Sequence, residues 1–245
     1  MKQKIFYAGD SIAQYNDYTT YPQTGMGQVL PLYIKQGITV VNYARNGRST
    51  KSFISEGRLK RIEAEIGKGD LLLIQFGHND EKVADPNRGT QPFGDFQENL
   101  MQFINVARDH EAYSVLITSL SRRIFSEDGR INRENHGDYP QAVRELGERE
   151  GVPVIDLCTE SMDYLDKIGD SASKKLYMNF EGGLYKYYPD GKSDNSHLRY
   201  DGAYLFAGMV AEGLKKLGGV YEAVCVTESM TEEEKAIETA MLKDW

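Results

Sequence analysis

The stretch KIFYAGDS, residues 4–11, places a short apolar run directly before a glycine, an aspartate and a serine. Similar apolar runs recur along the chain, at residues 39–43, 71–76, 114–118 and 152–157. Near-continuous apolarity over such a short run is typical of strands that are covered on both faces of a parallel sheet. The run that begins at Ile5 therefore predicts the first strand of a parallel sheet.

Longer stretches with helical periodicity lie between these runs. The clearest is residues 93–109, where apolar side chains recur at intervals of three and four residues. The others are residues 27–36, 59–66, 139–150, 161–168 and 203–217. Strands that alternate with helices predict an α/β protein, a three-layer α/β/α sandwich with right-handed crossovers.

Composition limits the class of protein. The 245 residues carry 29 Lys and Arg against 37 Asp and Glu, a net charge of −8, which argues against a phosphate-backbone binder because such a protein needs a basic face. Cys158 and Cys225 are too few for a disulfide framework and lack zinc-ligand spacing. The mean hydropathy is −0.54, and we expect no membrane span. No secretory signal precedes the first run, so we expect a cytoplasmic protein.

Two segments depart from the alternation of strands and helices. Residues 172–196 are rich in Tyr, Gly and Lys and predict a long loop or insertion. Residues 220–245 contain Thr231 followed by three glutamates, which is typical of the start of a helix. We therefore expect one α/β domain over residues 1–219 and a peripheral helical extension over residues 220–245.

Polar clusters follow the first three predicted strands, where parallel α/β sheets bind their ligands. They contain Ser11, Gly47 and Asn79, and a fourth cluster, Asp194-Asn-Ser-His197, precedes the last long helix. Taken singly, each has an ordinary interpretation as a helix cap, a turn or a surface histidine. His78 and Asp80 are metal-ligand types, but no third ligand follows at regular spacing, so we expect no metal.

Taken together, these residues fill every role that acyl transfer requires. Ser11 supplies a nucleophilic hydroxyl and His197 a base, and Asp194 can hold the imidazole in one tautomer. The backbone amides of Ser11 and Gly47 and the side-chain amide of Asn79 can stabilise an oxyanion. The four clusters therefore predict a serine esterase.

The four blocks, in this order, resemble those of the SGNH (GDSL) hydrolases over residues 5–217. Residues 46–53 (NGRSTKSF), residues 75–80 (QFGHND) and His197 with Gly202 and Ala203 resemble the rhamnogalacturonan acetylesterases of that superfamily. The resemblance implies a flavodoxin-like five-stranded parallel sheet of order 2-1-3-4-5. It also implies removal of acetyl groups from pectin-derived rhamnogalacturonan through an acetyl-enzyme, with no metal or other cofactor.

The same resemblance assigns roles to individual residues. It implies that Ser11 is the nucleophile, that Asp194 and His197 complete the triad, and that Gly47 and Asn79 complete the oxyanion hole. One departure is Gly25-Met26-Gly27, where relatives often carry Trp between the glycines. This departure affects the packing of the substrate subsite and leaves the catalytic residues unchanged.

Substrate contacts are predicted from charge and aromatic content. Arg48 and Lys51 are candidates to hold a galacturonate carboxylate, and so are Arg122 and Arg123. Tyrosines of the 172–196 segment are candidates to stack on sugar rings, namely Tyr177, Tyr185, Tyr187 and Tyr188. Solvated surface charge and ordinary loop packing are the alternative interpretations.

Other functions remain open at this point. One is a different SGNH activity, such as an acetyl-xylan esterase, a short-chain acyl esterase or a lipase, although the Tyr- and charge-rich loops do not suggest a wide apolar entrance. Another is a non-catalytic sugar-binding protein, which would be expected to lack a triad member. The expected partner is an acetylated oligosaccharide, with no nucleic acid and no membrane, and the sequence leaves the oligomeric state open.

Overall fold

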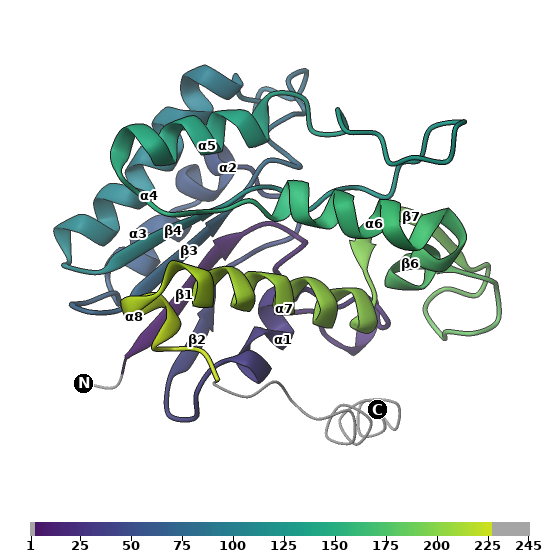
Figure 1. Ribbon diagram of the computed structural model, residues 1–245, viewed down its shortest axis with the longest axis horizontal. Coiled ribbons are helices and arrows are strands. Elements are labelled where there is room, and N and C mark those ends of the chain that lie inside the picture. Colours follow the sequence, from purple (N-terminus) through teal and green to yellow (C-terminus); the bar gives the residue numbers. More distant parts are fainter. Residues whose placement is uncertain (1–2, 227–245) are drawn as a thin grey trace.

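A five-stranded parallel sheet forms the centre of the computed structural model, which describes residues 3–226 (Figure 1). Its strands are β1 (Lys4–Gly9), β2 (Thr39–Asn42), β3 (Leu71–Gln75), β4 (Tyr113–Ile117) and β5 (Val154–Ile155). They lie in the order β2-β1-β3-β4-β5, and every neighbouring pair is parallel. The predicted order 2-1-3-4-5 is therefore confirmed.

Helices cover both faces of the sheet (Figure 1). One face packs against α1 (Met26–Val29), α6 (Leu157–Ser173) and α7 (Tyr200–Leu217). The other packs against α2 (Thr50–Ser55), α3 (Arg58–Glu63), α4 (Gln97–Asp109) and α5 (Tyr139–Glu150). In β1, Ile5 and Tyr7 enter the first core, and Phe6 and Ala8 enter the second. Since strand side chains alternate between faces, two cores require the unbroken apolar run of the sequence.

Helix positions differ from the prediction where turn chemistry competes with periodicity. The predicted helix 27–36 is the single turn α1 followed by a 3₁₀ turn, Leu30–Tyr33, with Pro31 near its start. The predicted helix 93–109 begins its regular part at Gln97, after a π-turn in which Gly94 is not helical. Residues 50–55 were not predicted as a helix, yet they form α2, where the Ser49 side chain accepts a hydrogen bond from the Ser52 amide.

The predicted long loop 172–196 contains most of a β-hairpin, so that prediction is wrong in part. Strands β6 (Tyr177–Phe180) and β7 (Lys192–Leu198) pair in antiparallel fashion. Burial of Tyr177, Met178 and Leu198 anchors the hairpin to the core. Because most of β7 is polar, its sequence carries no apolar alternation that would predict a strand.

The end of the described chain packs against the first core. After the short helix α8 (Gly219–Glu222), Val224 and Cys225 are buried, and Cys225 forms an isolated antiparallel bridge with Ile34. Packing of the α/β unit therefore continues as far as Cys225. The predicted helix beginning near Thr231 lies outside the described residues. Within residues 3–226, none of the helices combines the length and apolarity needed to cross a membrane.

Candidate active site

Ser11 lies on a tight turn at the carboxyl end of β1. The Asp10 carboxylate accepts a hydrogen bond from the Ile12 amide at 2.9 Å, and the Ala13 and Gln14 amides donate to the Asp10 carbonyl at 3.3 and 3.1 Å. Asp10 is buried, so its side chain fixes the turn from inside the protein. The turn holds the Ser11 hydroxyl at the edge of the sheet, as the sequence predicts.

Glycines 25 and 27 let α1 approach this turn closely. A Cβ at Gly25 would lie 2.1 Å from the Gln14 carbonyl oxygen, and one at Gly27 would lie 2.5 Å from the Ala13 carbonyl oxygen. Met26 between them is fully buried in the first core. The residue that departs from the family pattern therefore packs inside the protein, behind the Ser11 turn.

His197 brings the fourth cluster of the sequence to Ser11. The His197 Nε2 atom lies 3.0 Å from Ser11 Oγ, across 186 residues of sequence. His197 Nδ1 lies 2.8 Å from Asp194 Oδ2, and Asp194 Oδ1 accepts hydrogen bonds from the Ser196 and His197 amides at 2.9 and 3.0 Å. When Nδ1 carries the ring proton and donates a hydrogen bond to Asp194, the lone pair of Nε2 faces the Ser11 hydroxyl. This is the arrangement of a general base.

The Asp194 carboxylate is held in its ionised form. Its partial burial raises its pKa, but hydrogen bonds from the His197 side chain and from the His197 and Ser196 amides outweigh that effect. The net result is that the pKa of Asp194 lies well below its ordinary value. An ionised Asp194 can accept a hydrogen bond from the Nδ1–H group of His197 throughout the neutral pH range.

Arg123 holds the hairpin that carries the Asp194–His197 segment. Its guanidinium donates to Asn195 Oδ1 at 3.0 Å and to Asp170 Oδ1 at 2.6 Å, and its backbone amide donates to the Asn195 carbonyl. Asn179 Nδ2 donates to the Asp194 carbonyl at 3.0 Å. Arg123 is only 5% exposed. The interpretation of Arg123 as a substrate clamp is therefore wrong, because the guanidinium is buried with protein partners.

Gly47 is placed beside Ser11 by the order of the strands. Its loop follows β2 and is tied to the end of β1, because the Arg45 amide donates to the Gly9 carbonyl at 3.0 Å. Gly47 has a φ of +76°, a left-handed conformation that glycine adopts without strain. Within residues 3–226 the Gly47 amide donates no intramolecular hydrogen bond, so it is available to a ligand.

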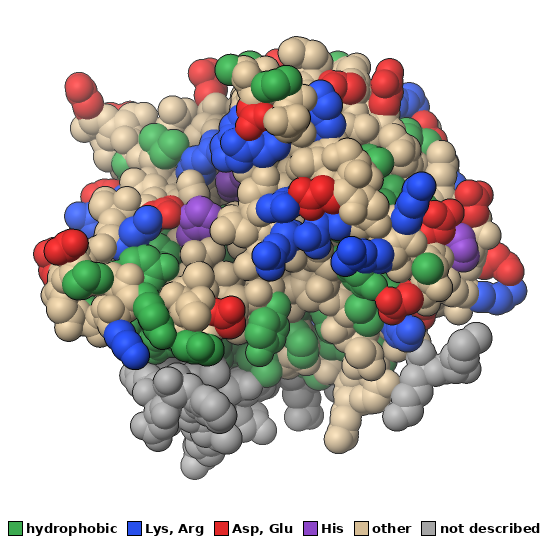
Figure 2. Space-filling view, turned by 180° about the vertical axis from the view of Figure 1, so that it is seen from behind, with side chains coloured by type: hydrophobic (Ala, Val, Ile, Leu, Met, Phe, Trp, Pro, Cys, Tyr) green, Lys and Arg blue, Asp and Glu red, His purple; other side chains and the backbone are tan. Residues whose placement is uncertain are grey.

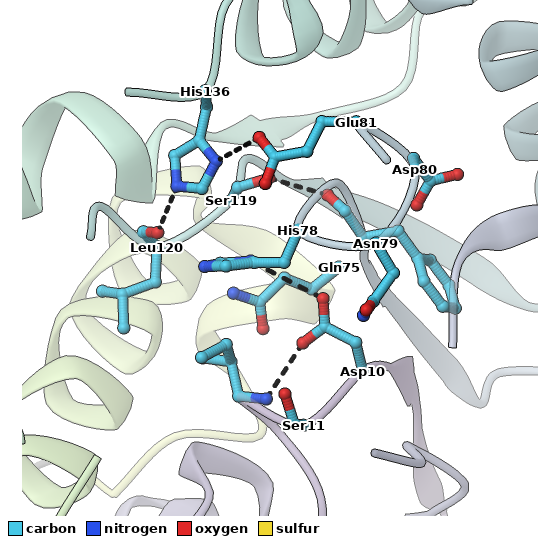
Figure 3. Close-up of polar contacts among 12 residues, drawn as sticks. Asp10, Ser11, Gln75, His78, Asn79, Asp80, Glu81, Ser119, Leu120 and His136 are labelled. Carbon is cyan, nitrogen blue, oxygen red and sulfur yellow. Dashed lines mark hydrogen bonds and ion pairs between the residues drawn. The ribbon is translucent and has the colours of Figure 1, made fainter. Parts of the chain in front are cut away.

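Asn79 follows β3, the other neighbour of β1. Its Nδ2 atom donates to the Arg48 carbonyl at 3.1 Å, and its Oδ1 atom accepts from Lys82 Nζ at 2.9 Å. Figure 3 shows the Asn79 side chain running from its loop toward the turn of Asp10 and Ser11. The three donors predicted from the sequence thus come from the carboxyl ends of three adjacent strands.

The sequence profile of the GDSL-like lipase/acylhydrolase family matches residues 7–197. The chain belongs to this family. Two curated relatives of this GDSL-family chain are from Bacillus subtilis (strain 168). Rhamnogalacturonan acetylesterase RhgT is 42% identical over 88% of this chain and 90% of its own, and probable rhamnogalacturonan acetylesterase YesY is 35% identical over 95% and 100%.

Solved structures share the fold of this GDSL-family chain. The Bacillus subtilis protein YXIM superposes with a TM-score of 0.76 at 27% identity, covering 89% of this chain and 57% of that one. The GDSL-family chain thus spans little more than half the length of that protein. Axe2, an acetylxylan esterase from Geobacillus stearothermophilus, superposes with a TM-score of 0.55 at 15% identity, over 88% of this chain and 95% of that one. At 15% identity the likeness to Axe2 concerns the fold alone.

A layer of buried polar side chains lies behind the site of the GDSL-family chain (Figure 3). His78 Nδ1 lies 3.6 Å from the Asp10 carboxylate, and the rings of His78 and His136 meet edge to face at 4.5 Å. His136 Nε2 lies 2.7 Å from the Leu120 carbonyl oxygen, and its Nδ1 lies 3.3 Å from Glu81. His136 was not singled out in the sequence, because no motif or spacing links it to the Ser11 block. Only the fold shows that His136 packs against His78 behind the site.

The acidic neighbour in the same block, Asp80, is also structural. Its carboxylate accepts hydrogen bonds from the Thr50 amide at 3.0 Å and the Thr50 hydroxyl at 2.5 Å, and so joins the β3 loop to the start of α2. Within residues 3–226 no group of three or more His, Cys, Asp or Glu side chains is arranged to hold a metal ion. The Asp80 carboxylate is therefore occupied by Thr50, and His78 faces the Asp10 carboxylate at 3.6 Å.

Acid is expected to destabilise this GDSL-family fold through its buried histidines. Burial lowers the pKa of His78 and of His136 from 6.5 to about 4, so the unfolded chain binds protons that the folded chain does not. The contribution of the two neutral histidines to the free energy of unfolding is fully present above pH 6.5 and is lost as the pH falls toward 4. Between pH 7 and pH 5 the loss is about 2 kcal/mol for each histidine. Burial raises the pKa of Asp80 to about 7, so the folded chain binds this proton more tightly than the unfolded chain does. Acidification from pH 7 to pH 5 therefore stabilises the fold at Asp80 by about 2 kcal/mol, which offsets part of the loss at the histidines. The net expectation is a loss of about 2 kcal/mol, measured by urea unfolding at the two pH values.

The variant His136→Gln isolates one of these groups. It is expected to be less stable than the parent at pH 7 but to lose less stability on acidification, because one buried titrating group is gone. His110→Gln serves as the control, since His110 lies half-buried at the end of α4 and outside this layer. The same pH dependence in His136→Gln as in the parent would contradict the assignment.

The predicted substrate cations differ in their surroundings. The Arg48 guanidinium contacts the Glu56 carboxylate twice, at 3.0 and 2.9 Å. Arg122 is paired with Glu81, and it also donates to the Asn135 carbonyl at 2.9 Å. Lys51 is exposed on α2 and forms no ion pair with any of residues 3–226. Unlike Arg48 and Arg122, Lys51 therefore has no carboxylate partner among residues 3–226, so its charge can pair with a ligand.

The predicted tyrosines also divide into buried and exposed side chains. Tyr177 is fully buried and its hydroxyl donates to the Ser121 carbonyl at 2.8 Å, so its interpretation as a sugar-stacking residue is wrong. Tyr185 packs edge-on against Tyr21 at 5.6 Å, and Arg199 donates to its hydroxyl at 3.1 Å.

The exposed tyrosines gather next to one another. Tyr187 is 43% exposed and its ring lies 6.3 Å from that of Tyr18, which is 74% exposed. Tyr18 follows the Ser11 turn in the sequence, and Tyr187 precedes the strand of His197. Figure 2 shows histidine side chains at a hollow on one face of the molecule, with Lys and Arg side chains beside it.

Proposed function

We propose that this protein is a serine esterase that removes O-acetyl groups from rhamnogalacturonan oligosaccharides. The observation that carries the proposal is the line of contacts from Ser11 Oγ through the His197 ring to Asp194, at 3.0 and 2.8 Å. Support for the substrate comes from RhgT and YesY, which are named as rhamnogalacturonan acetylesterases and match most of the chain.

The proposed reaction proceeds through an acetyl-enzyme. Ser11 Oγ attacks the acetyl carbonyl carbon while His197 Nε2 takes the hydroxyl proton. The charge on the carbonyl oxygen is stabilised by the amides of Ser11 and Gly47 and by Asn79 Nδ2. The bond to the sugar oxygen then breaks, and His197 gives the proton to that oxygen. Water, deprotonated by His197, attacks the acetyl-enzyme and releases acetate and free Ser11.

The proposed substrate contacts are Arg48, Lys51, Tyr185 and Tyr187. Lys51 supplies a charge for a uronate carboxylate, and the exposed ring of Tyr187 supplies a stacking surface. Arg48 and Tyr185 also have partners in Glu56 and Arg199, and in this proposal those partners hold the two side chains in place for the substrate. Exposed tyrosine and lysine side chains suit a sugar better than a lipid chain.

Acetate release from defined oligosaccharides tests this function. The enzyme is expected to deacetylate rhamnogalacturonan oligosaccharides with a kcat/KM about 10-fold or more above that for acetylated xylan oligosaccharides. Tyr187→Ala is expected to raise KM for the rhamnogalacturonan substrate about 5-fold, because a stacking contact is lost. Hydrolysis of p-nitrophenyl acetate by the same variant is expected to stay unchanged.

Tyr113→Ala is the matched control for the tyrosine. Tyr113 is 40% exposed but lies at the start of β4, at the edge of the sheet opposite to Ser11. Equal kcat/KM for the two acetylated oligosaccharides would contradict the proposed substrate. An equal loss of both activities in Tyr187→Ala would contradict the stacking contact.

A further inference from the structure

The Asn79 carboxamide is held at both of its ends. Lys82 Nζ lies 2.9 Å from Asn79 Oδ1, and Asn79 Nδ2 donates to the Arg48 carbonyl at 3.1 Å. Because an ammonium group only donates, the atom that faces Lys82 must be the amide oxygen. This contact excludes the flipped amide, and it leaves one Nδ2 hydrogen atom with a fixed direction.

Lys82 reaches Asn79 through the local turn that follows β3. The Glu81 amide donates to the Gly77 carbonyl at 3.0 Å, and the Lys82 amide donates to the Asn79 carbonyl at 3.3 Å. These backbone bonds place the two side chains on the same side of the turn. Asn79 itself is 3% exposed, so water competes little for its amide.

The Lys82 charge is not neutralised by a direct partner. It forms no ion pair with any of residues 3–226, and the charged groups that act on it are Arg88, Asp85 and Asp10. Lys82 is exposed overall, and only its contact with Asn79 is partly buried. Desolvation at this contact lowers the pKa of Lys82. Its strongest contact within the described chain is therefore the neutral amide oxygen of Asn79.

We propose that Lys82 is a positioning residue that aims and strengthens the Asn79 oxyanion donor. An ammonium at Oδ1 draws electron density from the amide, so the remaining N–H becomes a stronger hydrogen-bond donor. The effect is largest when the acyl oxygen becomes negative, so it favours the transition state over the bound substrate. The inference rests on the proposed esterase function, and it adds a residue that supports the oxyanion hole through Asn79.

The test is a double-mutant cycle on p-nitrophenyl acetate, a substrate that carries no carboxylate. Lys82→Met is expected to lower kcat about 10-fold with KM unchanged, and Asn79→Ala to lower it about 10²–10³-fold. Lys82→Met introduced into Asn79→Ala is expected to cause no further loss, because Lys82 acts through Asn79. Lys82→Arg, which keeps a charged donor, is expected to recover most of the activity of the parent enzyme.

Lys60→Met is the control, since Lys60 is an exposed lysine of α3 outside the site. The same fold-loss from Lys82→Met with and without Asn79 would overturn the proposal. A loss confined to uronate-bearing oligosaccharides would overturn it as well, because Lys82 would then hold the substrate. Failure of the proposed function itself would be seen separately, as parent enzyme that does not hydrolyse p-nitrophenyl acetate.

Discussion

Ser11→Ala is expected to lower kcat on p-nitrophenyl acetate by roughly five to six orders of magnitude, the size of loss that follows removal of a triad nucleophile. Ser11 Oγ is the hydroxyl that faces His197 Nε2, at 3.0 Å. The turn itself should survive, since it is held by the Asp10 carboxylate and by backbone hydrogen bonds that alanine retains. The loss is therefore expected without a change in the free energy of unfolding beyond about 1 kcal/mol.

Covalent labelling identifies the nucleophile independently of turnover. A serine-directed phosphonate is expected to add one label to the parent enzyme, at Ser11, and none to Ser11→Ala. Ser126→Ala is the control, because Ser126 lies on an exposed loop after β4 and its backbone, which alanine retains, bonds to Arg130 and Gly129. Near-normal turnover by Ser11→Ala, or a label on another serine, would rule out the nucleophile assignment.

The strands, and the site residues that directly follow them, could be predicted from the sequence. The apolar runs predict the strands, because a sheet covered on both faces requires apolar residues at every position. The Ser11, Gly47 and Asn79 blocks each follow such a run, so strand order alone decides whether they meet. Once the resemblance supplied the order 2-1-3-4-5, β1 had to lie between β2 and β3, as the structure confirms.

The features that could not be predicted depend on long-range partners. Arg123 has the composition of a surface cation, but Asp170 and Asn195 surround it, and both are distant in the sequence. His136 lies far from His78 in the chain, and only the packing of the loops after β3 and β4 brings their rings together. Strand β7 pairs with β6 through its backbone, so its polar side chains gave no periodic signal.

Asp194→Asn is expected to lower kcat about 10⁴-fold, which is the size of loss seen when a catalytic histidine is held in the wrong tautomer. Asp194 Oδ1 accepts from the Ser196 and His197 amides at 2.9 and 3.0 Å, so the asparagine oxygen is expected to occupy this place. The NH₂ group of the asparagine then faces His197 Nδ1. Since NH₂ donates, Nδ1 must accept, and the ring proton moves to Nε2, where it points at Ser11.

Nitrogen-15 NMR of the histidine rings checks this tautomer argument directly. The chain has four histidines, and the His197 signals can be assigned with a His197→Gln variant. The parent enzyme is expected to show a protonated Nδ1 at neutral pH, and Asp194→Asn a protonated Nε2. Asp190→Asn is the control, as Asp190 is an exposed residue of the same hairpin. A 10⁴-fold loss without a change of tautomer would show that Asp194 acts by its charge, whereas normal turnover would show that the Asp194 contact is not needed for catalysis.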